Sequence, residues 1–577
     1  MINNTFQKLP CGEARFNTLL ERNFAYVDKT MFIERLEGSS YSYPFIVRPR
    51  RFGKTLFVNT LAAYYDKNQA DNFDKIFAGT YIHDHKTPLQ GKYRILRFNF
   101  SGITSGKDLI KNFAYALLSS FKDFVKKYSL KNVDIDKIVS QAQDPAALLK
   151  LFCAEVKDSN KRDIYLIIDE YDQFANEVLS VDTKAFLEMT ADDGFLRCFY
   201  AAIKEQTDDV IDRIFITGVT SVSLDSISSG FNIATNISSD ENYATMFGFS
   251  SNELLNVIKR CIDLKKYGVE ADNILARMKE LYNGYRFSLD CNSTVFNPEM
   301  CIHYLNAIQT TNKEPRQLLP PNTSGDISKI ANFMALCKDE SLQYDVCKAV
   351  LNNQDIEIPA FPSTINLNKV KKLSRLEVLS VMLYMGFLTW SQDDEFQLRC
   401  PNKVIKEQFF DYYFSYIVEF DDLHFIATPK LINAHNALHQ GQILPLLNYV
   451  SDMLTNTSGN HSLAHFSENS IQIALQGACH SSSNIRVTAD AEIIGKGYCD
   501  VLIEENSSND SRFAYLIELK YLSCNKASHE AIEQKYQEAI TQVQKYVRSE
   551  RFAKLSLLKY GVAVFVGTRL VKTSFLK

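Results

Sequence analysis

The segment Gly53-Lys54-Thr55 has the residue types and the position of a phosphate-binding loop. It follows a short apolar run, residues 43–47, and precedes apolar side chains that recur at helical spacing. The first turn of a helix offers unpaired N–H groups and partial positive charge to phosphates. We therefore expect Lys54 to reach the β- and γ-phosphates of a nucleotide and Thr55 to bind Mg²⁺, while Gly53 allows close backbone approach.

The start of this loop departs from the usual phosphate-loop pattern. Arg48 stands where the first glycine is expected, and Pro49 beside it has no N–H to donate. We expect Arg50 and Arg51 to compensate with charge, and we include Phe52 in the segment that contacts the nucleotide. The departure bears on affinity and turnover rather than on the position of the loop.

A second set of chemical groups follows the apolar run 164–168, which ends in Asp169 and Glu170. A buried strand that ends in two carboxylates can hold Mg²⁺ and polarise a water molecule. We expect Asp169 to contact the metal, directly or through water, and Glu170 to act on the attacking water. Thr217 ends another apolar run, 214–217. We expect it either to sense the γ-phosphate or, equally, to act as a capping residue. Gly-Lys-Thr and Asp-Glu also occur at ordinary helix starts and surfaces, but both follow predicted buried strands, where α/β sheets bind ligands.

A third set lies near the C-terminus. Asp500 begins the apolar strand candidate 500–503, and Glu518 and Lys520 lie in the strand candidate 513–521. Alternate residues of a strand share a face, so Glu518 and Lys520 point the same way, and a hairpin would bring Asp500 beside them. Two carboxylates can hold Mg²⁺, and a lysine can orient water and stabilise phosphate charge. A buried Glu518–Lys520 salt bridge is the structural alternative.

The elements that must position these residues indicate an α/β fold. Strand candidates at 43–47, 93–100, 164–168 and 214–217 alternate with helical stretches, which predicts a parallel sheet. Helical periodicity dominates from about 250 to 420. Residues 320–325 and 456–461 are expected loops or boundaries. After them we expect a helix, two strands and a long helix near 531–546.

Composition limits the class of protein. The chain has 577 residues, 46% hydrophobic and 23% charged, and a net charge of −4, so any nucleic-acid contact must come from a local patch. From Lys520 onward, eleven Lys and Arg face four acidic residues, which suits a phosphate backbone or an ordinary solvated helix. No apolar run of membrane-spanning length and no secretory signal is visible. The 12 scattered cysteines form no Cys-x-x-Cys pair, and free thiols fit a cytoplasmic location, with delivery to another cell left open.

Several of these strings together resemble the predicted AAA-ATPase-like family of bacterial proteins. The resemblance covers nearly the whole chain and rests on seven strings, of which the second is the most specific: residues 26–30 (Tyr-Val-Asp-Lys-Thr), 48–55, 217–220, 282–287, 297–298, 382–389 and 401–402. It implies that Arg48 is a family trait. Such proteins commonly end in a PD-(D/E)XK nuclease-like domain, which implies Glu468 as an acidic metal ligand on the preceding helix. It also implies Gln542 as the polar residue of the following helix, with Tyr546 nearby. Arg286 could reach a phosphate or form a structural ion pair.

We therefore expect three parts. Residues 1–248 form a P-loop NTPase domain, residues 249–445 a mainly helical region that could include a winged helix, and residues 446–577 a restriction-endonuclease-like α/β domain. The hypothesis is that ATP and Mg²⁺ binding or hydrolysis gates a Mg²⁺-dependent nuclease domain acting on DNA or RNA, in a protein that could also form oligomers. The alternative is a nucleotide-switched signalling or scaffold protein whose C-terminal domain binds a partner without cleavage.

Overall fold

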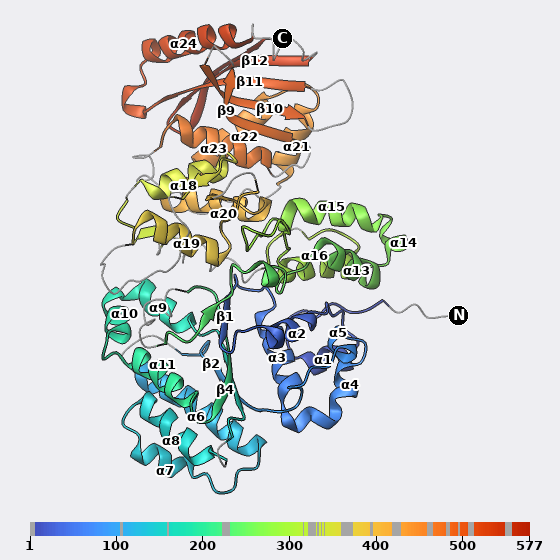
Figure 1. The fold of residues 1–577 in the computed structure, drawn as a ribbon. Helices are drawn as coiled ribbons and strands as arrows, with labels where there is room; N and C mark the ends of the chain where they lie inside the picture. The colour runs from blue at the N-terminus through green and yellow to red at the C-terminus, as the bar shows by residue number, and fades with distance from the viewer. Residues whose placement is uncertain are drawn as a thin grey trace. The chain divides into compact units, whose positions relative to one another are not determined.

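The computed structural model of the chain describes residues 6–576, with gaps at 104–107, 159–160, 222–230, 316, 321–330, 332–333, 336, 340, 359–372, 393–395, 418–427, 458–465, 481–484, 494–496, 506–512 and 548–556. The described residues divide into two compact units (Figure 1). The first comprises Met1–Glu340 and Asp355–Val404, and the second comprises Ser341–Gln354 and Ile405–Lys577. The expected loops at 320–325 and 456–461 lie largely outside the described residues.

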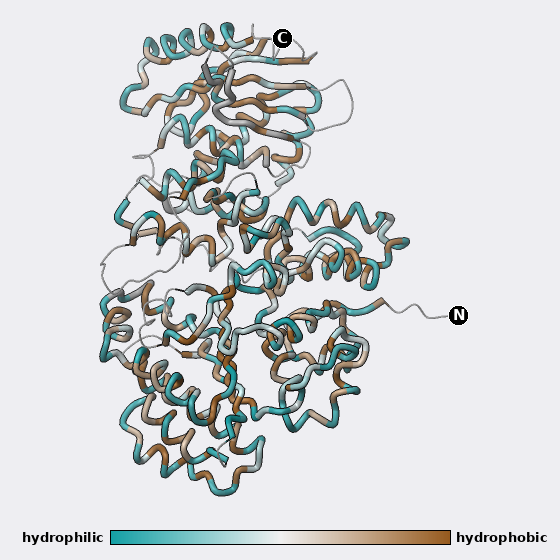
Figure 2. The backbone as a smooth tube through the Cα atoms, viewed as in Figure 1, coloured by the Kyte–Doolittle hydropathy of each residue, from teal (hydrophilic) through white to brown (hydrophobic). Residues whose placement is uncertain are grey.

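A five-stranded parallel sheet forms the centre of the first unit. Its strand order is β2-β3-β4-β1-β5, and all four strand pairs are parallel. The strands span Pro44–Val47 (β1), Arg94–Asn99 (β2), Ile164–Asp169 (β3), Ile211–Gly218 (β4) and Thr235–Asn236 (β5). Every residue of β3 is buried, as expected for a strand covered on both faces. The apolar runs of these strands stand out in brown in Figure 2.

The register of this sheet places the expected site residues at one edge. Ile168 of β3 pairs with Ile216 of β4, and Ile46 of β1 pairs with Thr217. The residue after Ile168 is Asp169, so it lies level with Thr217 at the carboxyl ends of the strands. Strand β4 therefore separates the loop after β1 from the carboxylates after β3.

Helices cover this sheet and complete its core. Helix α3, Lys54–Tyr65, follows the loop after β1 and packs on β2 and β3, while α6, Leu109–Lys127, packs on β2. The other helices of residues 1–248 are α1 (Phe16–Glu21), α2 (Met31–Gly38), α4 (Phe73–Phe77), α5 (Tyr81–Asp84), α7 (Ile135–Gln141), α8 (Pro145–Val156), α9 (Gln173–Val181), α10 (Thr183–Thr190) and α11 (Phe195–Gln206).

The rest of the first unit is mainly helical, as expected from its periodicity. Its helices are α13 (Ser251–Cys261), α14 (Leu264–Tyr267), α15 (Ala271–Tyr282), α16 (Pro298–Thr311) and α19 (Arg375–Met385). Capping boxes at Ser250 and Ser374 fix the starts of α13 and α19. An antiparallel sheet of order β6-β8-β7 spans Ile356–Glu357, Gln397–Arg399 and Thr389–Trp390. This helix-and-hairpin order suits a winged helix, which stays a prediction.

The second unit contains a mixed five-stranded sheet of order β13-β12-β11-β10-β9. Its strands are β9 (Ile485–Ile493), β10 (Gly497–Glu505), β11 (Phe513–Leu522), β12 (Leu557–Val566) and β13 (Arg569–Leu576). Only β11 and β12 pair in parallel. Its helices are α18 (Leu342–Leu351), α20 (Lys403–Tyr412, from the last residues of the first unit), α21 (Pro429–Leu438), α22 (Leu444–Thr457), α23 (Glu468–His480) and α24 (His529–Val547).

These observations confirm the α/β fold class, the parallel sheet and the helical middle. The expected boundaries at residues 248 and 445 stay a prediction. Strands β9, β12 and β13 were not expected from the sequence. Among the described residues, no helix is long and apolar enough to cross a membrane. All 12 cysteines are free thiols in the structure.

Candidate active sites

The loop after β1, in which we expect phosphates to bind and which we call the cradle, leads directly into helix α3. Gly53 has φ +90° immediately before α3, a left-handed conformation that a side chain would strain. Lys54, the first residue of the helix, is buried, and its Nζ donates to the carbonyl oxygens of Arg48 and Pro49, each at 2.9 Å. Burial lowers the pKa of Lys54 to about 8, although nearby carboxylates act in the opposite direction. The ammonium is therefore held inside the loop, where phosphates would approach.

Arg48 turns away from this cradle into the interior. Its guanidinium is 1% exposed and donates to the carbonyl oxygens of Val47, Ser238 and Tyr243 at 2.8–3.1 Å. It also lies over the ring of Phe287, 4.3 Å from the centroid. The arginine at the expected glycine position therefore connects the end of β1 to residues 238–243 and to Phe287.

The three residues before Gly53 have different surroundings. Arg51 adopts a left-handed φ of +69°, and its Nε lies 3.2 Å from Glu299 at the start of α16. The Arg50 carbonyl accepts from Asn297 at 3.4 Å. Phe52 is 1% exposed and packs on Tyr285 and Phe287, with ring centroids 4.9 and 5.4 Å apart. The Phe52 ring therefore belongs to an aromatic cluster, and the expected roles of these three residues toward a nucleotide stay predictions.

Asp169 and Glu170 lie opposite the cradle at the end of β3. Asp169 is fully buried; its Oδ2 lies 3.4 Å from Arg97, and its Oδ1 accepts no hydrogen bond within the described part of the chain. Glu170 has φ +50°, and burial, with Asp169 next, raises the pKa of its carboxyl. Both carboxylates act electrostatically on Lys54, so the structure brings the lysine and the acidic pair together.

Thr217 completes this edge of the sheet. Its side chain is 0% exposed, and its Oγ1 makes no hydrogen bond to any described residue. It therefore caps nothing described here, and a buried hydroxyl without a partner is the kind of group that a ligand could satisfy.

A cavity of about 670 Å³ opens on this loop. Arg50, Arg51, Phe52, Gly53, Lys54, Thr55 and Glu170 line it, together with residues of the N-terminal segment 10–27, of 246–249 and of α16. The cavity is larger than a triphosphate needs and has both polar and apolar walls, as small-molecule sites usually do.

Asp172 is a site residue that we did not expect. It is fully buried and accepts from the backbone N–H groups of Val219 and Thr220 and from the Thr220 hydroxyl, at 2.6–3.2 Å. A Cβ on Gly218 would lie 2.3 Å from Asp172 Oδ1, so only glycine fits there. Asp172 thereby ties the turn after β3 to the turn after β4. In the sequence, the feature that could have indicated Asp172 is an additional acidic residue just after the Asp169-Glu170 pair.

Arg286 is structural. It is 6% exposed and its guanidinium donates to the carbonyl oxygens of Leu289, Cys291 and Ser391. These backbone carbonyls satisfy the guanidinium, and no ion pair of Arg286 occurs among the described residues. The phosphate contact considered from the sequence stays a prediction.

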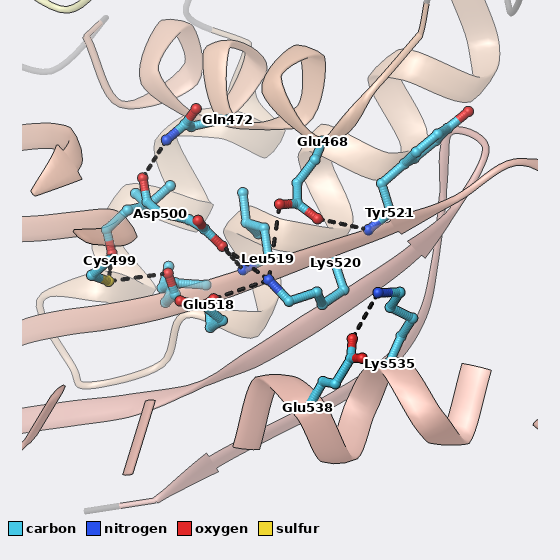
Figure 3. Close-up of polar contacts among 12 residues, drawn as sticks. Glu468, Gln472, Cys499, Asp500, Glu518, Leu519, Lys520, Tyr521, Lys535 and Glu538 are labelled. Atoms are coloured by element: carbon cyan, nitrogen blue, oxygen red, sulfur yellow. Dashed lines mark hydrogen bonds and ion pairs between the residues drawn. The ribbon is translucent and has the colours of Figure 1, made fainter. Parts of the chain in front are cut away.

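The second cluster lies on β10, β11 and the start of α23 (Figure 3). Lys520 Nζ is 2.9 Å from Glu518 Oε1, 3.8 Å from Asp500 Oδ2 and 3.9 Å from Glu468 Oε1. The pairing of Val501 with Ile517 places Asp500 opposite Glu518, as expected for a hairpin. Leu519 between them is fully buried. The structure thus brings together all four residues that we singled out here.

Backbone contacts hold these carboxylates in place. Asp500 Oδ2 accepts from the Leu519 N–H at 2.7 Å, and Glu468 Oε2 accepts from the Tyr521 N–H at 3.1 Å. Gln472, one turn after Glu468 on α23, donates to the Asp500 carbonyl. Gln472 was not expected, and only its helical spacing from Glu468 could have indicated it.

The electrostatics of the cluster are those of crowded acids around one cation. Burial, reinforced by Glu518, raises the pKa of Asp500 to about 7. Burial also raises the pKa of Glu518, in spite of Lys520. Burial disfavours the charged form of Lys520, but the carboxylates outweigh it and raise its pKa. Glu518 is 2% exposed, and its Oε2 has no hydrogen-bond partner among the described residues.

The helix that follows, α24, presents an apolar face to the sheet. Ala539, Val543 and Tyr546 are buried in the core of this unit, and Glu518 and Asp500 both raise the pKa of Tyr546, after burial. Gln542 is exposed and has no described contact with the cluster. Tyr546 therefore lies within electrostatic reach of the carboxylates, whereas the expected role of Gln542 stays a prediction.

Both sites offer oxygen ligands that suit Mg²⁺. In the first, Asp169 has a buried oxygen that accepts no hydrogen bond from any described residue, and Thr55 lines the cavity beside Lys54. In the second, Glu518 has such an oxygen next to Asp500. Within the described ranges, no three His, Cys, Asp or Glu side chains already enclose a metal-sized space. In the second site the ammonium of Lys520 lies among the carboxylates, so a metal there would require that side chain to shift.

Comparisons with known proteins found a relative and a solved structure that are similar to this chain. A protein of Azotobacter chroococcum mcd 1, described as an uncharacterized protein in the vnfD 5′ region, is 28% identical over 297 residues. That match covers 51% of this chain and 50% of the relative, so the chain matches only about half of that protein's length. The crystal structure of Cdc6p from Pyrobaculum aerophilum is 11% identical, with a TM-score of 0.27, over 66% of this chain and 91% of that one.

Two family models match separate parts of the chain. The model described as predicted AAA-ATPase matches residues 10–228, which contain Lys54, Asp169 and Glu170. The model described as PD-(D/E)XK nuclease superfamily matches residues 466–574, which contain the cluster around Lys520. The chain therefore combines a segment that is similar to the predicted AAA-ATPase family with a C-terminal segment that is similar to the PD-(D/E)XK nuclease superfamily.

Proposed function

We propose that the chain is a Mg²⁺-dependent nuclease of DNA or RNA whose N-terminal domain binds and hydrolyses ATP. The observation that carries the nuclease part is the convergence of Asp500, Glu518 and Glu468 on Lys520, within 3.9 Å of its Nζ. A structural salt bridge alone needs one carboxylate. Three carboxylates surround one lysine here, and a buried oxygen of Glu518 has no hydrogen-bond partner in the part of the chain that the structure describes. Such an arrangement costs stability and suits a site that binds a cation.

The residues of the second site have distinct roles in this proposal. Asp500 and Glu518 would hold Mg²⁺, with Glu468 as the further acidic ligand. A bound Mg²⁺ lowers the pKa of water and neutralises phosphate charge. Lys520 would orient the attacking water and stabilise the charge that develops on the phosphate. The locally basic C-terminal segment would supply contacts to the nucleic-acid backbone.

The residues of the first site would perform phosphoryl transfer to water. Lys54 and the N–H groups at the start of α3 would bind the β- and γ-phosphates. Asp169 and Thr55 would hold Mg²⁺, Thr217 would contact the γ-phosphate, and Glu170 would accept the proton of the attacking water. The raised pKa of Glu170 suits a general base, because it moves proton affinity toward neutral pH.

The nuclease is tested on the full chain with plasmid DNA and with single-stranded RNA, with and without Mg²⁺ and ATP. Lys520→Ala and Asp500→Asn should abolish cleavage, whereas Lys430→Ala should not, because Lys430 is exposed and pairs only at the surface with Asp452. Absence of cleavage by the wild type under every metal and nucleotide condition would refute the nuclease.

The ATPase is tested by phosphate release. Glu170→Gln should keep nucleotide binding and lower turnover by about 10²–10⁴-fold, the usual contribution of a general base. Lys54→Ala should lose binding, whereas Lys150→Ala, in an exposed pair with Glu205, should change neither. Turnover that survives Glu170→Gln unchanged would remove this residue from the mechanism.

One observation favours a second candidate, a nucleotide-switched signalling or scaffold protein. Arg48, Arg51 and Phe52 of the phosphate loop contact side chains of the segment 285–299. A change in the loop on phosphate binding would therefore alter the conformation of that segment. Nucleotide-dependent assembly or partner binding without phosphodiester cleavage would support this candidate over the nuclease.

A further inference from the structure

Strand β2 carries an arginine beside the nucleotide site that the proposed roles do not use. Arg97 lies in the sequence Arg-Ile-Leu-Arg-Phe-Asn and pairs in register with Ile167, two residues before Asp169. Alternation along paired strands puts Arg97 and Asp169 on the same face of the sheet, the face against which α3 packs. Its side chain is one-third exposed, whereas that of Asp169 is fully buried.

Arg97 is the partner that compensates the buried carboxylate. Its Nη2 lies 3.4 Å from Asp169 Oδ2, and within the described residues Asp169 has no other ion pair. The second oxygen, Oδ1, accepts no hydrogen bond there. A buried carboxylate needs such a charge, because desolvation without a cation is expensive.

Helix α3 holds the guanidinium in this position. Arg97 Nη1 donates to Asn59 Oδ1, and Asn59 Nδ2 donates to the carbonyl oxygen of Ala14 at 2.6 Å. Ala14 lines the nucleotide cavity, and Asn59 lies on the helix that starts with Lys54. The planar fork of arginine can bridge a carboxylate and an amide at once, which a lysine cannot do in the same geometry.

We propose that Arg97 is a positioning residue that occupies the electrostatic place of the divalent cation at Asp169, and thereby sets how much Mg²⁺ the site requires. The inference rests on the proposed nucleotide function. Arg97 stabilises the Asp169 carboxylate when the metal is not bound, and it competes with the metal by charge when Mg²⁺ arrives. Removing its charge leaves Asp169 a stronger ligand.

The size of the effect follows from Coulomb's law. Arg97 Nη2 lies 3.4 Å from Asp169 Oδ2, and one-third of the Arg97 side chain is exposed, so solvent screens the pair. Opposite unit charges at this separation attract each other by about 1.2 kcal/mol when screened as in water, which corresponds to a factor of about ten in an equilibrium constant. We therefore expect the affinity of the site for Mg²⁺ to rise by about tenfold on loss of this charge.

The experiment measures binding of a fluorescent ATP analogue to the full chain as Mg²⁺ is titrated. Arg97→Gln removes the charge and keeps an amide next to Asn59, so the half-saturating Mg²⁺ concentration should fall about tenfold. Arg97→Lys keeps the charge and should stay near the wild type. An unchanged or higher Mg²⁺ requirement in Arg97→Gln would overturn the inference.

Two controls separate this effect from general damage. Arg94→Gln removes an arginine of the same strand that pairs with Asp163 at 2.5 Å, and should lower stability without changing the Mg²⁺ requirement. In an Asp169→Asn background, Arg97→Gln should have no further effect, because the carboxylate on which it acts is gone.

If Arg97→Gln does not fold, Asn59→Ala should lower the Mg²⁺ requirement by releasing the guanidinium, and no change would count against the inference. Failure of the wild type to bind the analogue at any Mg²⁺ concentration would instead refute the proposed nucleotide function.

Discussion

Replacement of Asp500 by asparagine should stabilise the second unit at alkaline pH while it removes cleavage. The pKa of Asp500 rises from 3.8 to about 7 on folding, because burial and Glu518 disfavour its ionised form. The folded state therefore binds more protons than the unfolded state between about pH 4 and pH 7. Stability that is present below pH 4 is lost as the pH rises through 7.

The size of this loss of stability follows from the rise in the pKa of Asp500 on folding. At about 1.4 kcal/mol per pKa unit, these two pKa values imply a loss of about 2.6 kcal/mol between pH 5 and pH 8 from this group alone. The Asp500 side chain is 21% exposed, so solvent screening reduces the figure, and we expect about 1–3 kcal/mol. Asparagine keeps an oxygen that can accept from the Leu519 N–H, so the hydrogen bond at 2.7 Å need not be lost.

The assay must report the second unit separately, because a chain of two units does not unfold in one step. Urea titration followed by hydrogen-exchange mass spectrometry of β10 and β11 peptides meets this need, at pH 5 and pH 8. The variant should lose less stability than the wild type between the two pH values, whereas Glu504→Gln, at the far end of β10, should behave like the wild type. Equal pH dependence in Asp500→Asn and the wild type would refute the reasoning.

Three further changes should have distinct outcomes. Gly218→Ala places a Cβ 2.3 Å from Asp172 Oδ1, so it should destabilise the first unit by about 1–3 kcal/mol in urea denaturation and weaken binding of the nucleotide analogue. Normal binding would show that the turn after β3 and the turn after β4 are independent. Arg48→Met leaves three buried carbonyl oxygens without their donor and should cost about 2–4 kcal/mol, measured by the same denaturation; a neutral result would mean that water replaces the guanidinium. Lys520→Met leaves three carboxylates without their cation, so it should raise the pKa of Asp500 further and lower the free energy of unfolding of the second unit by about 3–5 kcal/mol at pH 8. Hydrogen exchange of β11 measures this change, and a stabilised variant at pH 8 would contradict the prediction.

The sequence was sufficient for much of the first unit because its strands are buried and continuous. The run 164–168 has no polar residue, and the structure extends it by one residue to Asp169. The carboxyl ends of parallel strands meet at one edge, so Lys54 and the acidic pair could be brought together without any tertiary information. In the second unit, the period of two in β11 was enough to predict that Glu518 and Lys520 face the same way.

The sequence was insufficient where long-range contacts decide the outcome. Whether Arg48 faces a phosphate or the interior depends on carbonyl oxygens that are 190 and 195 residues away in the chain. The partners of Arg97 likewise come from α3 and β3. Strands β12 and β13 follow α24 and have interrupted hydropathy, and their pairing with β11 depends on a parallel crossover that local periodicity does not report.

The aromatic contacts of Phe52 have a practical consequence for any attempt to express the N-terminal part alone. A fragment that ends at residue 228 or 248 would lack Tyr285 and Phe287 and would present the Phe52 ring to water. Pro49 would also lose Gly386, where an added Cβ would come within 2.7 Å of the proline ring. Such a truncation would expose apolar surface and distort the loop, so a fragment intended for purification should keep these later segments of the first unit.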